Sequence, residues 1–518
     1  MQLEKGRISD KIKMNTQRQT DNSNSRRFFL KRTALFLQEI ATKRAFIILL
    51  IGIFGFAIAN VSLLGVSVTP STDFGESVEK IMPLLYWSGI AVMIAALSCM
   101  LTRLDAKESR IPFLISCAML IFSMRSVLAI LSPFPPVLDA WGGINVSMTW
   151  RKYGIFSPEG LARFSGGYVR GWPFSFILAY LITAAGVPIY TFYQWAPTII
   201  LIMDMIAVYF LFKELANEKI GMVSAFLFTL LNTNSVFTLH YCPQGLAALF
   251  YLVTMYAIVR AYKTRKLKHL ALALLGIFTV VVTHHMTTLF LGIGLIGAYL
   301  SKYFLGLQQK ASNKNKWFLF TVKSDTFIKF SLPLAAFTFA LWYLYGFIVY
   351  RRDATWMLTE IMRLLTTHEP RYGAGYYYYY VIQSPVSKLA VIMFPAFILA
   401  TASIYLFSRI RKKESLEGYL WLSMGWAGAL MVAFIFGNMI YGNYIDPSRS
   451  REIITVALYP ASALFLLRIF ESKSLYKKGL VTIILIIVAF FSVFSIYRGA
   501  QNIIYFEPPW WMSWFNPP

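Results

Sequence analysis

Apolar runs of roughly 18–24 residues recur along the chain, separated by short polar stretches. A helix of that length crosses the hydrocarbon core of a bilayer, where every backbone polar group has to be paired internally. Only helices and closed barrels meet that condition, and barrel strands would alternate apolar and polar residues over about ten positions. The runs in this chain are continuous, and the composition is 57% hydrophobic but only 14% charged. The sequence therefore predicts an all-α, polytopic transmembrane helical protein.

The apolar runs predict about thirteen full spans and one shorter helix. The spans are expected at residues 44–67, 80–102, 111–132, 192–212, 220–236, 244–264, 268–286, 288–305, 326–349, 388–409, 417–440, 453–470 and 478–498. The stretch Trp172–Pro188 is also apolar, but counting it as a full span would place the basic cluster at 263–268 outside. It is therefore predicted to be a short re-entrant or interfacial helix.

Positive charge predicts the orientation of the spans. The formal net charge is +25, and Lys and Arg gather in clusters at 263–268, 302–323, 409–413 and 473–478, which fall on one side of the predicted membrane. That side is expected to be cytoplasmic, in a multi-pass protein of the cell membrane. The predicted spans leave no basic domain in water, which excludes nucleic acid as a partner. The three cysteines have neither disulfide nor zinc-ligand spacing.

Four parts are predicted along the chain. They are a polar, basic cytoplasmic leader at 1–43, two extra N-terminal transmembrane helices at 44–110, a transmembrane core at 111–470, and a last transmembrane helix with an aromatic outer tail at 471–518. The core carries outer loops at 133–172, 350–387 and 441–452. The candidate functional residues fall in these loops or in the short turns between spans.

Asp139 is the only carboxylate of the first outer loop before Glu159. It follows a proline-rich stretch that limits the freedom of the backbone. A carboxylate held at the membrane surface can act as a general base for an acceptor hydroxyl, or as a metal ligand. Aspartate is also favoured as the cap or first-turn residue of a helix. The residues alone leave both interpretations open.

Arginine dominates among the predicted outer cations, whereas the cytoplasmic loops carry most of the lysines. The planar guanidinium group binds phosphate oxygens through two parallel hydrogen bonds, which the lysine ammonium cannot do. The outer arginines therefore indicate a bound phosphate group, or contact with ordinary lipid headgroups. The candidates are Arg170, Arg352, Arg371, Arg449 and Arg451.

Two short polar clusters lie at span ends. One contains Tyr241 and Gln244 in the sequence Tyr-Cys-Pro-Gln, and the other contains His284 and His285 in Thr-His-His-Met-Thr. Adjacent residues of a helix point about 100° apart, so the two histidines are poor joint ligands for one metal. Hydrogen bonds to a substrate and satisfied contacts between helices are both compatible with these residues.

The order of these motifs resembles that of the glycosyltransferase C superfamily, whose members transfer sugars from polyprenyl-phosphate carriers on the outer face of a membrane. The resemblance covers roughly residues 111–470 and includes archaeal members with a Pro-Gln pair and a Thr-His-His-x-Thr segment. The matching residues are Leu138-Asp139-Ala-Trp, Tyr153-Gly154, Gly167-Tyr-Val-Arg-Gly-Trp-Pro173, Pro243-Gln244 and Thr283-His-His-Met-Thr287.

The resemblance implies a membrane glycosyltransferase with a site that opens outward. Asp139 would be the catalytic base, the outer arginines would neutralise the departing phosphate, and the two span-end clusters would line the substrate cavity. The implied partners are a polyprenyl-phosphate sugar donor, a glycan, lipid or protein acceptor, and membrane lipids. The first loop lacks an Asp-x-Asp or Asp-Glu pair, so no metal ligand is assigned, and a divalent metal stays an open alternative.

A transporter or flippase of a lipid-linked or anionic saccharide is the alternative function. It would use the same arginines and the intramembrane Asp204 without making a bond.

Overall fold

The computed structural model describes residues 43–64, 66, 82–102, 109–125, 127–131, 138–165, 173–230, 241–315, 325–349, 385–412, 414, 416–441 and 447–500, and every regular element in them is a helix. The helices are α2 Lys43–Leu64, α4 Leu84–Leu101, α5 Arg110–Arg125, α6 Val127–Leu131, α7 Leu138–Tyr153, α8 Pro158–Ser165, α10 Pro173–Ala184, α11 Ile189–Leu215, α12 Glu218–Thr229, α13 Pro243–Thr264, α14 Leu267–Thr283, α15 His285–Asn315, α16 Asp325–Val349, α19 Pro385–Arg411, α20 Gly418–Tyr441, α21 Pro447–Phe470 and α22 Leu475–Ala500.

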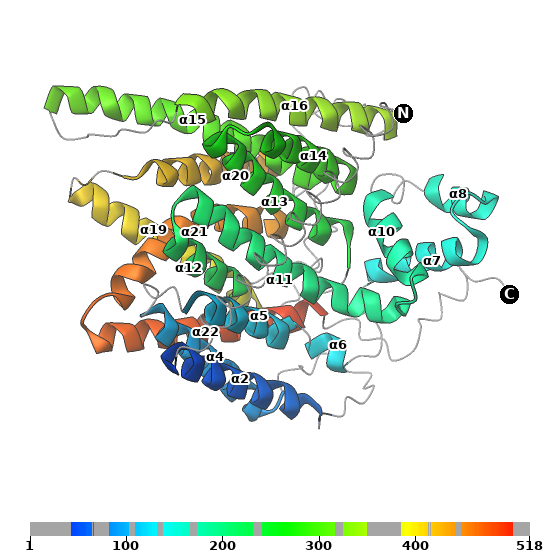
Figure 1. Cartoon of the computed structure of the whole chain (residues 1–518), viewed down its shortest axis with the longest axis horizontal. Helices are drawn as coiled ribbons and strands as arrows, with labels where there is room; N and C mark the ends of the chain where they lie inside the picture. Colours follow the sequence, from blue (N-terminus) through cyan, green and yellow to red (C-terminus); the bar gives the residue numbers. More distant parts are fainter. Residues whose placement is uncertain are drawn as a thin grey trace, which may run out of the picture.

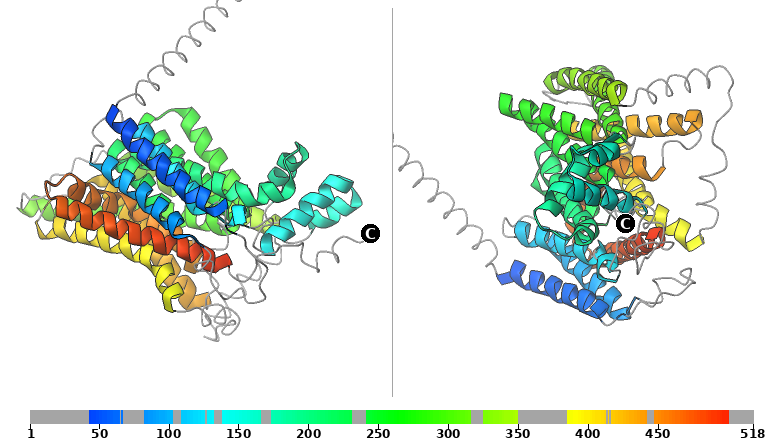
Figure 2. Two further views of the ribbon diagram at one scale, coloured as in Figure 1. Left: turned by 90° about the horizontal axis from the view of Figure 1, so that it is seen from below. Right: turned by 90° about the vertical axis from the view of Figure 1, so that its right-hand side faces the viewer.

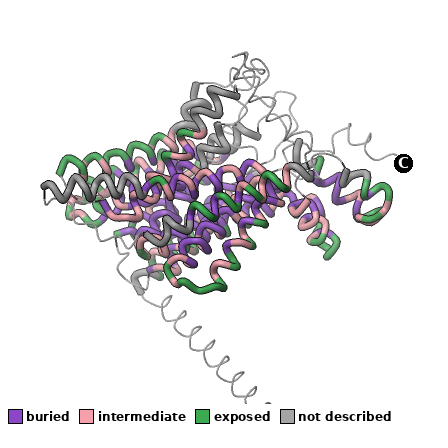
Figure 3. Tube along the Cα trace, turned by 90° about the horizontal axis from the view of Figure 1, so that it is seen from above, coloured by how far each residue is buried: buried purple, intermediate pink, exposed green. Residues whose placement is uncertain are grey.

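The long helices lie side by side in a bundle, and α7, α8 and α10 project beyond it at one end (Figures 1 and 2). Neighbours in sequence often pack together, as α2 does with α4 and α13 with α14. Distant segments also meet, since α15 packs on α20 and α19 on α21. Buried residues fill the interior of the bundle and exposed residues follow its outer sides (Figure 3).

The outer sides of the bundle are themselves apolar. Phe54 in α2, Phe407 in α19 and Ile483 in α22 are among the large apolar side chains that are exposed. A soluble protein rarely exposes apolar surface of this extent, whereas lipid tails cover such surface in a bilayer. The described part of the chain therefore has the faces of a membrane protein.

Seven of the described helices are long and apolar enough to cross a membrane. These segments are Phe46–Leu64, Leu84–Leu101, Ile189–Leu215, Pro243–Thr264, Met393–Arg411, Ile453–Phe470 and Leu475–Ser492. The remaining predicted spans coincide with helices that are shorter or described only in part, so the predicted number of spans is not confirmed.

Two of the predicted segments differ from a single long helix. The predicted span at 111–132 contains α5 and the five-residue α6, and Ser126 between them lies outside the described residues. The stretch predicted as a short re-entrant or interfacial helix forms α10, which has 12 residues. Such a helix is about 18 Å long, which is too short for a hydrocarbon core of about 30 Å.

The predicted outer loops are partly helical. The segment 133–172 contains α7 and α8, and α21 begins at Pro447 inside the segment 441–452. The segment 350–387, the leader up to residue 42 and the tail after residue 500 lie outside the described residues, apart from the start of α19 at Pro385.

Ion pairs gather at the end of the bundle that the charge pattern predicts to be cytoplasmic. They include Arg110–Glu218 at 3.1 Å, Lys219–Glu471 at 3.1 Å and Arg260–Glu214 at 2.5 Å. Burial tends to raise the pKa of Glu218, but hydrogen bonds from Tyr209, Arg110 and Lys213 outweigh it and hold the pKa below its usual value. The candidate motifs fall at the opposite helix ends, as Gln244 and Arg260 do at the two ends of α13.

Candidate functional site

Tyr241 holds the turn that precedes α13. Its hydroxyl donates to the carbonyl of Ser175 in α10 at 2.7 Å, and its N–H donates to the carbonyl of Tyr193 in α11 at 3.4 Å. Its ring packs against Phe192 and Tyr193, with centroids 4.7 and 5.5 Å away. Tyr241 therefore joins three segments that are distant in sequence, and its own hydroxyl is already engaged.

The start of α13 follows directly from the local sequence. The Sγ atom of Cys242 accepts a hydrogen bond from the N–H of Gly245 at 3.4 Å, which caps the helix. Pro243 occupies the first turn, where its missing N–H costs nothing and its fixed φ suits a helix. This arrangement places Gln244 in the first turn of α13, three residues after Tyr241.

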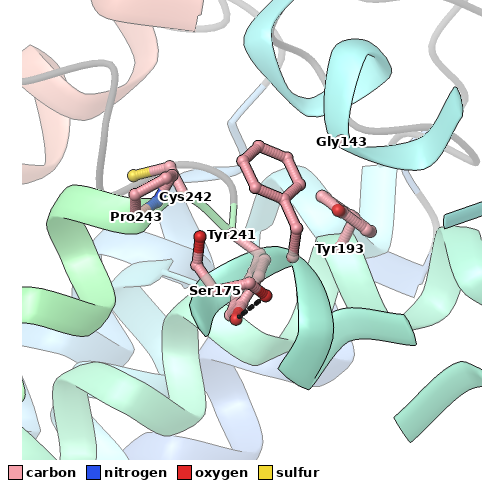
Figure 4. Close-up of a pocket in the computed structure, with 7 residues that line it drawn as sticks. Gly143, Ser175, Tyr193, Tyr241, Cys242 and Pro243 are labelled. Atoms are coloured by element: carbon pink, nitrogen blue, oxygen red, sulfur yellow. Dashed lines mark hydrogen bonds between the residues drawn. The ribbon is translucent and has the colours of Figure 1, made fainter. Parts of the chain in front are cut away.

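A small recess of about 10 Å³, room for about one water molecule, lies where α7, α10 and α11 meet this turn (Figure 4). Its lining residues are Gly143, Ser175, Phe176, Tyr193, Tyr241, Cys242 and Pro243. None of these residue types carries a formal charge at neutral pH. Gly143 is required for the close packing of α7 on α11, because a Cβ atom at this position would overlap the hydroxyl of Tyr193.

The hydroxyl of Tyr193, whose side chain is 1% exposed, and the hydroxyl of Ser147, one turn after Gly143, are buried and interact with each other. The buried Oε1 atom of Gln244 lacks a hydrogen-bonding partner among the described residues. Burying such an atom without a partner costs about 1–3 kcal/mol. Unpaired polar atoms of this kind indicate a place where a ligand or an ordered water supplies the missing hydrogen bond.

His284 caps a helix. Its Nδ1 atom accepts a hydrogen bond from the N–H of Thr287 at 3.3 Å and lies 2.9 Å from the hydroxyl of Thr287. Because α14 ends at Thr283 and α15 begins at His285, His284 is the residue between two helices, with extended backbone. The ring of His285 lies 5.3 Å from that of His284. Of the two roles predicted for His284, the structure thus shows the structural one, a hydrogen bond within the protein.

The α13–α14 hairpin brings the two span-end clusters to the same end of the bundle. Gly276 of α14 lies against Thr254 of α13, so close that a Cβ atom on Gly276 would overlap the Thr254 hydroxyl. Gln244 lies ten residues before Thr254 in α13, and α15 begins about ten residues after Gly276. Gln244 is therefore level with the start of α15. Helix α10 packs against both α13 and α14 and connects this hairpin end to the recess.

The predicted catalytic residue lies in the same region. Helix α7 begins at Leu138, so Asp139 is in its first turn, four residues and about one turn before Gly143. This is also the first-turn position at which aspartate is favoured on structural grounds. By contrast, the buried Asp204 lies eleven residues beyond Tyr193 in α11, about 16 Å away along the helix.

The predicted phosphate-binding arginines are only partly described. Arg449 and Arg451 lie in the first turns of α21. Arg170, Arg352 and Arg371 lie outside the described residues. Among the side chains that the structure describes, no group of three His, Cys, Asp or Glu residues comes together as a metal site.

Gly143, Ser147 and Tyr193 are not among the residues predicted from the sequence. A usable signal was present for the first of them, since Gly142-Gly143 follows Asp139 by one helical turn, and glycine inside a helical stretch often marks a close approach. Tyr193 carries no such signal, because a tyrosine near the end of an apolar span is common at membrane interfaces.

The capping role of His284 leads to a prediction about stability. His284→Ala is expected to destabilise the protein by about 1 kcal/mol, whereas His284→Asn is expected to retain most of that stability, because asparagine is a good cap and alanine is not. Thermal unfolding of the purified protein in detergent measures both variants. Equal loss of stability in the two variants would show that the histidine ring, rather than capping, stabilises this junction.

Comparison with solved structures finds chains of similar fold. The apo crystal structure of the Archaeoglobus fulgidus oligosaccharyltransferase aligns with 80% of this chain and 59% of that chain, at 12% sequence identity and a TM-score of 0.50. A structure of the same enzyme tethered to an acceptor peptide with an NVT sequon aligns with 78% of this chain and 56% of that chain, at 13% identity and a TM-score of 0.46.

This chain thus spans less than two thirds of the length of the oligosaccharyltransferase that it matches. No family model matches the sequence, and no curated protein does. The similarity is therefore one of fold.

Proposed function

We propose that this protein is a membrane glycosyltransferase that transfers a sugar from a polyprenyl-phosphate-linked donor to an acceptor on the outer face of the membrane. One observation carries the proposal. The first turn of α7, which contains Asp139, lies about one turn from a recess built by α10, α11 and the Tyr241–Gln244 turn. Segments from 138 to 285 thus converge at one end of the bundle. The shared fold of an oligosaccharyltransferase supports the same chemistry.

In the proposed reaction, Asp139 accepts the proton of an acceptor hydroxyl as its oxygen attacks the anomeric carbon of the donor sugar. A new bond forms between that carbon and the acceptor oxygen, and the bond from the carbon to the phosphate oxygen breaks. The electron pair of the broken bond leaves with the polyprenyl phosphate. A carboxylate in the first turn of a helix is favoured in its ionised form, which is the form that accepts a proton.

The start of α21 is the proposed binding place for the departing phosphate. Arg449 and Arg451 lie in its first turns, and a helix N-terminus adds partial positive charge and free N–H groups. Arg170, Arg352 and Arg371 are proposed to contribute from the outer loops. Gln244, His284 and His285 are proposed to line the cavity beside the recess, with the lipid tail held between the helices.

A deletion strain tests the proposed function. Surface glycans and polyprenyl-linked saccharides are profiled by mass spectrometry in the wild type, in the deletion, and in the deletion that expresses the gene again. We expect the deletion to lack one sugar on the acceptor and to accumulate the matching lipid-linked donor, and re-expression to reverse both changes. An unchanged profile would contradict the proposal.

The same extracts separate transfer from transport. Purified protein in detergent is mixed with the lipid fraction of the deletion strain and with membranes that lack the sugar. A transferase attaches the sugar under these conditions, where no intact bilayer separates two sides. A flippase attaches nothing without a bilayer, so restoration that requires intact membranes would favour transport.

A further inference from the structure

Pro197 lies in the interior of α11, well after the first turn of the helix at Ile189. A proline in a helix has no N–H, so the carbonyl four residues earlier loses its hydrogen bond within the helix. In α11 that carbonyl belongs to Tyr193. It accepts instead the N–H of Tyr241 at 3.4 Å, from the turn that precedes α13. The proline therefore leaves open the carbonyl that binds this turn.

The side chain of Tyr193 contacts a different neighbour. Its hydroxyl interacts with Ser147 of α7, and it packs so closely on this helix that a Cβ atom on Gly143 would overlap it. Asp139 lies about two turns before Ser147 in the same helix. Tyr193 thus contacts the helix of Asp139 through its side chain, and the turn that leads to Gln244 through its main chain.

We propose that Tyr193 is a positioning residue, which sets the separation between the helix of Asp139 and the turn that leads to Gln244, and that Pro197 acts through it by keeping its carbonyl open. This inference rests on the proposed function and concerns the same site. Tyr193 acts in it without touching a substrate, because it fixes the place of two groups that do.

Contacts of different kinds hold the turn before α13. The hydroxyl of Tyr241 donates to the carbonyl of Ser175 in α10 at 2.7 Å, and its ring packs on the ring of Tyr193, with centroids 5.5 Å apart (Figure 4). Both of these contacts use the side chain, which can rotate while the backbone shifts. The bond from the N–H of Tyr241 fixes the backbone itself. Its loss is therefore expected to let Gln244 move while Tyr241 stays buried.

Pro197→Ala tests the role of the open carbonyl. Alanine supplies an N–H that can bond to the carbonyl of Tyr193 within α11 and so competes with Tyr241. Alanine is also the best helix former, so the variant is expected to fold. Pro197 is buried, and Pro197→Val supplies the same N–H with a bulkier side chain than alanine. An effect in Pro197→Ala alone would assign it to a void at this position and overturn the inference.

The matched control is Pro395→Ala. Pro395 also lies in the interior of a helix, α19, which carries none of the proposed site residues. The change in helix propensity is the same as in Pro197→Ala. This variant is expected to match the wild type in the exchange of Tyr241 and in transfer. An effect as large as that of Pro197→Ala would show a general response to the loss of a helix proline and overturn the inference.

Hydrogen exchange followed by mass spectrometry measures the bond to Tyr241 directly, in purified protein in detergent. The amide of Tyr241 is expected to exchange about 2–10-fold faster in Pro197→Ala and Pro197→Val than in the wild type, as the loss of one hydrogen bond predicts. Fragments from α10 and from the second half of α13 are expected to exchange as in the wild type. Unchanged exchange of Tyr241 overturns the inference.

The two contacts of Tyr193 are expected to have different kinetic effects. Pro197→Ala loosens the turn that leads to Gln244, so the KM for a substrate is expected to rise about 2–10-fold with kcat nearly unchanged. Tyr193→Phe removes the contact with Ser147 and loosens the helix of Asp139, so kcat is expected to fall about 2–10-fold with KM nearly unchanged. A general loss of folded protein would lower kcat alone in both variants, and that result overturns the inference.

Exchange and transfer together separate this inference from the proposed function. If the exchange of Tyr241 depends on Pro197 but the protein transfers no sugar, the link through Tyr193 stands and the proposed function is wrong. If Tyr241 exchanges as in the wild type in both Pro197 variants while transfer depends on Asp139, the inference is wrong and the proposed function stands.

Discussion

Asp139→Asn is expected to lower the rate of sugar transfer by about 10²–10⁴-fold, the usual contribution of a general base. Asparagine has nearly the same shape as aspartate and is also well suited to the start of a helix, so α7 and the adjoining recess are expected to stay in place. The amide cannot accept the proton of the acceptor hydroxyl, and the loss is therefore expected in kcat rather than in the binding of the donor. Transfer from extracted lipid-linked saccharide, followed by mass spectrometry, measures the rate.

The matched control for this variant is Glu159→Gln. Glu159 is an exposed carboxylate in the first turn of α8, on the same projecting part of the molecule. It is expected to retain wild-type transfer, because it lies outside the recess. Full activity of Asp139→Asn would remove Asp139 from the mechanism, and equal losses in the two variants would point to a general effect of negative charge on the outer helices.

Gly425→Ala is expected to destabilise the protein by about 3 kcal/mol, at the upper end of the cost of overpacking a core. Helices α15 and α20 cross with their backbones in contact at Gly297 and Gly425. A Cβ atom on Gly425 would overlap the carbonyl oxygen of Gly297 and lie 2.8 Å from the Cβ atom of Ser301. A backbone carbonyl cannot rotate away as a side chain can, so the helices have to separate.

Separation of these helices would also disturb their neighbours. The indole N–H of Trp426 donates to the hydroxyl of Tyr251 in α13 at 2.7 Å, and this buried hydrogen bond lies next to the crossing. The matched control is Gly428→Ala in the same helix, where a Cβ atom would meet nothing within 4 Å. Thermal unfolding in detergent and the yield of monodisperse protein measure both. Equal stability of the two variants would show that the crossing can relax without cost.

The sequence predicted the class of fold because the physical signal was local. A run such as 478–498 is apolar over its whole length, and the helix α22 is found there. The bilayer imposes internal pairing of the backbone on any such run, whatever it packs against. The number of spans is less well determined by hydropathy, which reports the length and polarity of a run: seven of the described helices are long and apolar enough to cross a membrane.

The candidate site was predictable only in part. Asp139, Tyr241, Gln244 and His284 could be singled out because they belong to short polar motifs that follow one another in a set order along the chain. Sequence could not say what each side chain does there. The structure engages the hydroxyl of Tyr241 with Ser175 and the ring of His284 with Thr287, so both of these residues hold segments together.

The sequence by itself determined which segments lie in a membrane and which lie in water. The hydrophobic length of each run specifies helices in a membrane, and the placement of Lys and Arg predicts their orientation. Only the tertiary structure decided which polar groups meet. Gly143 and Tyr193 are fifty residues apart in the chain, and nothing in the periodicity of either segment encodes the other. Their contact depends on how closely α7 approaches α11, which the absence of a Cβ atom at Gly143 allows.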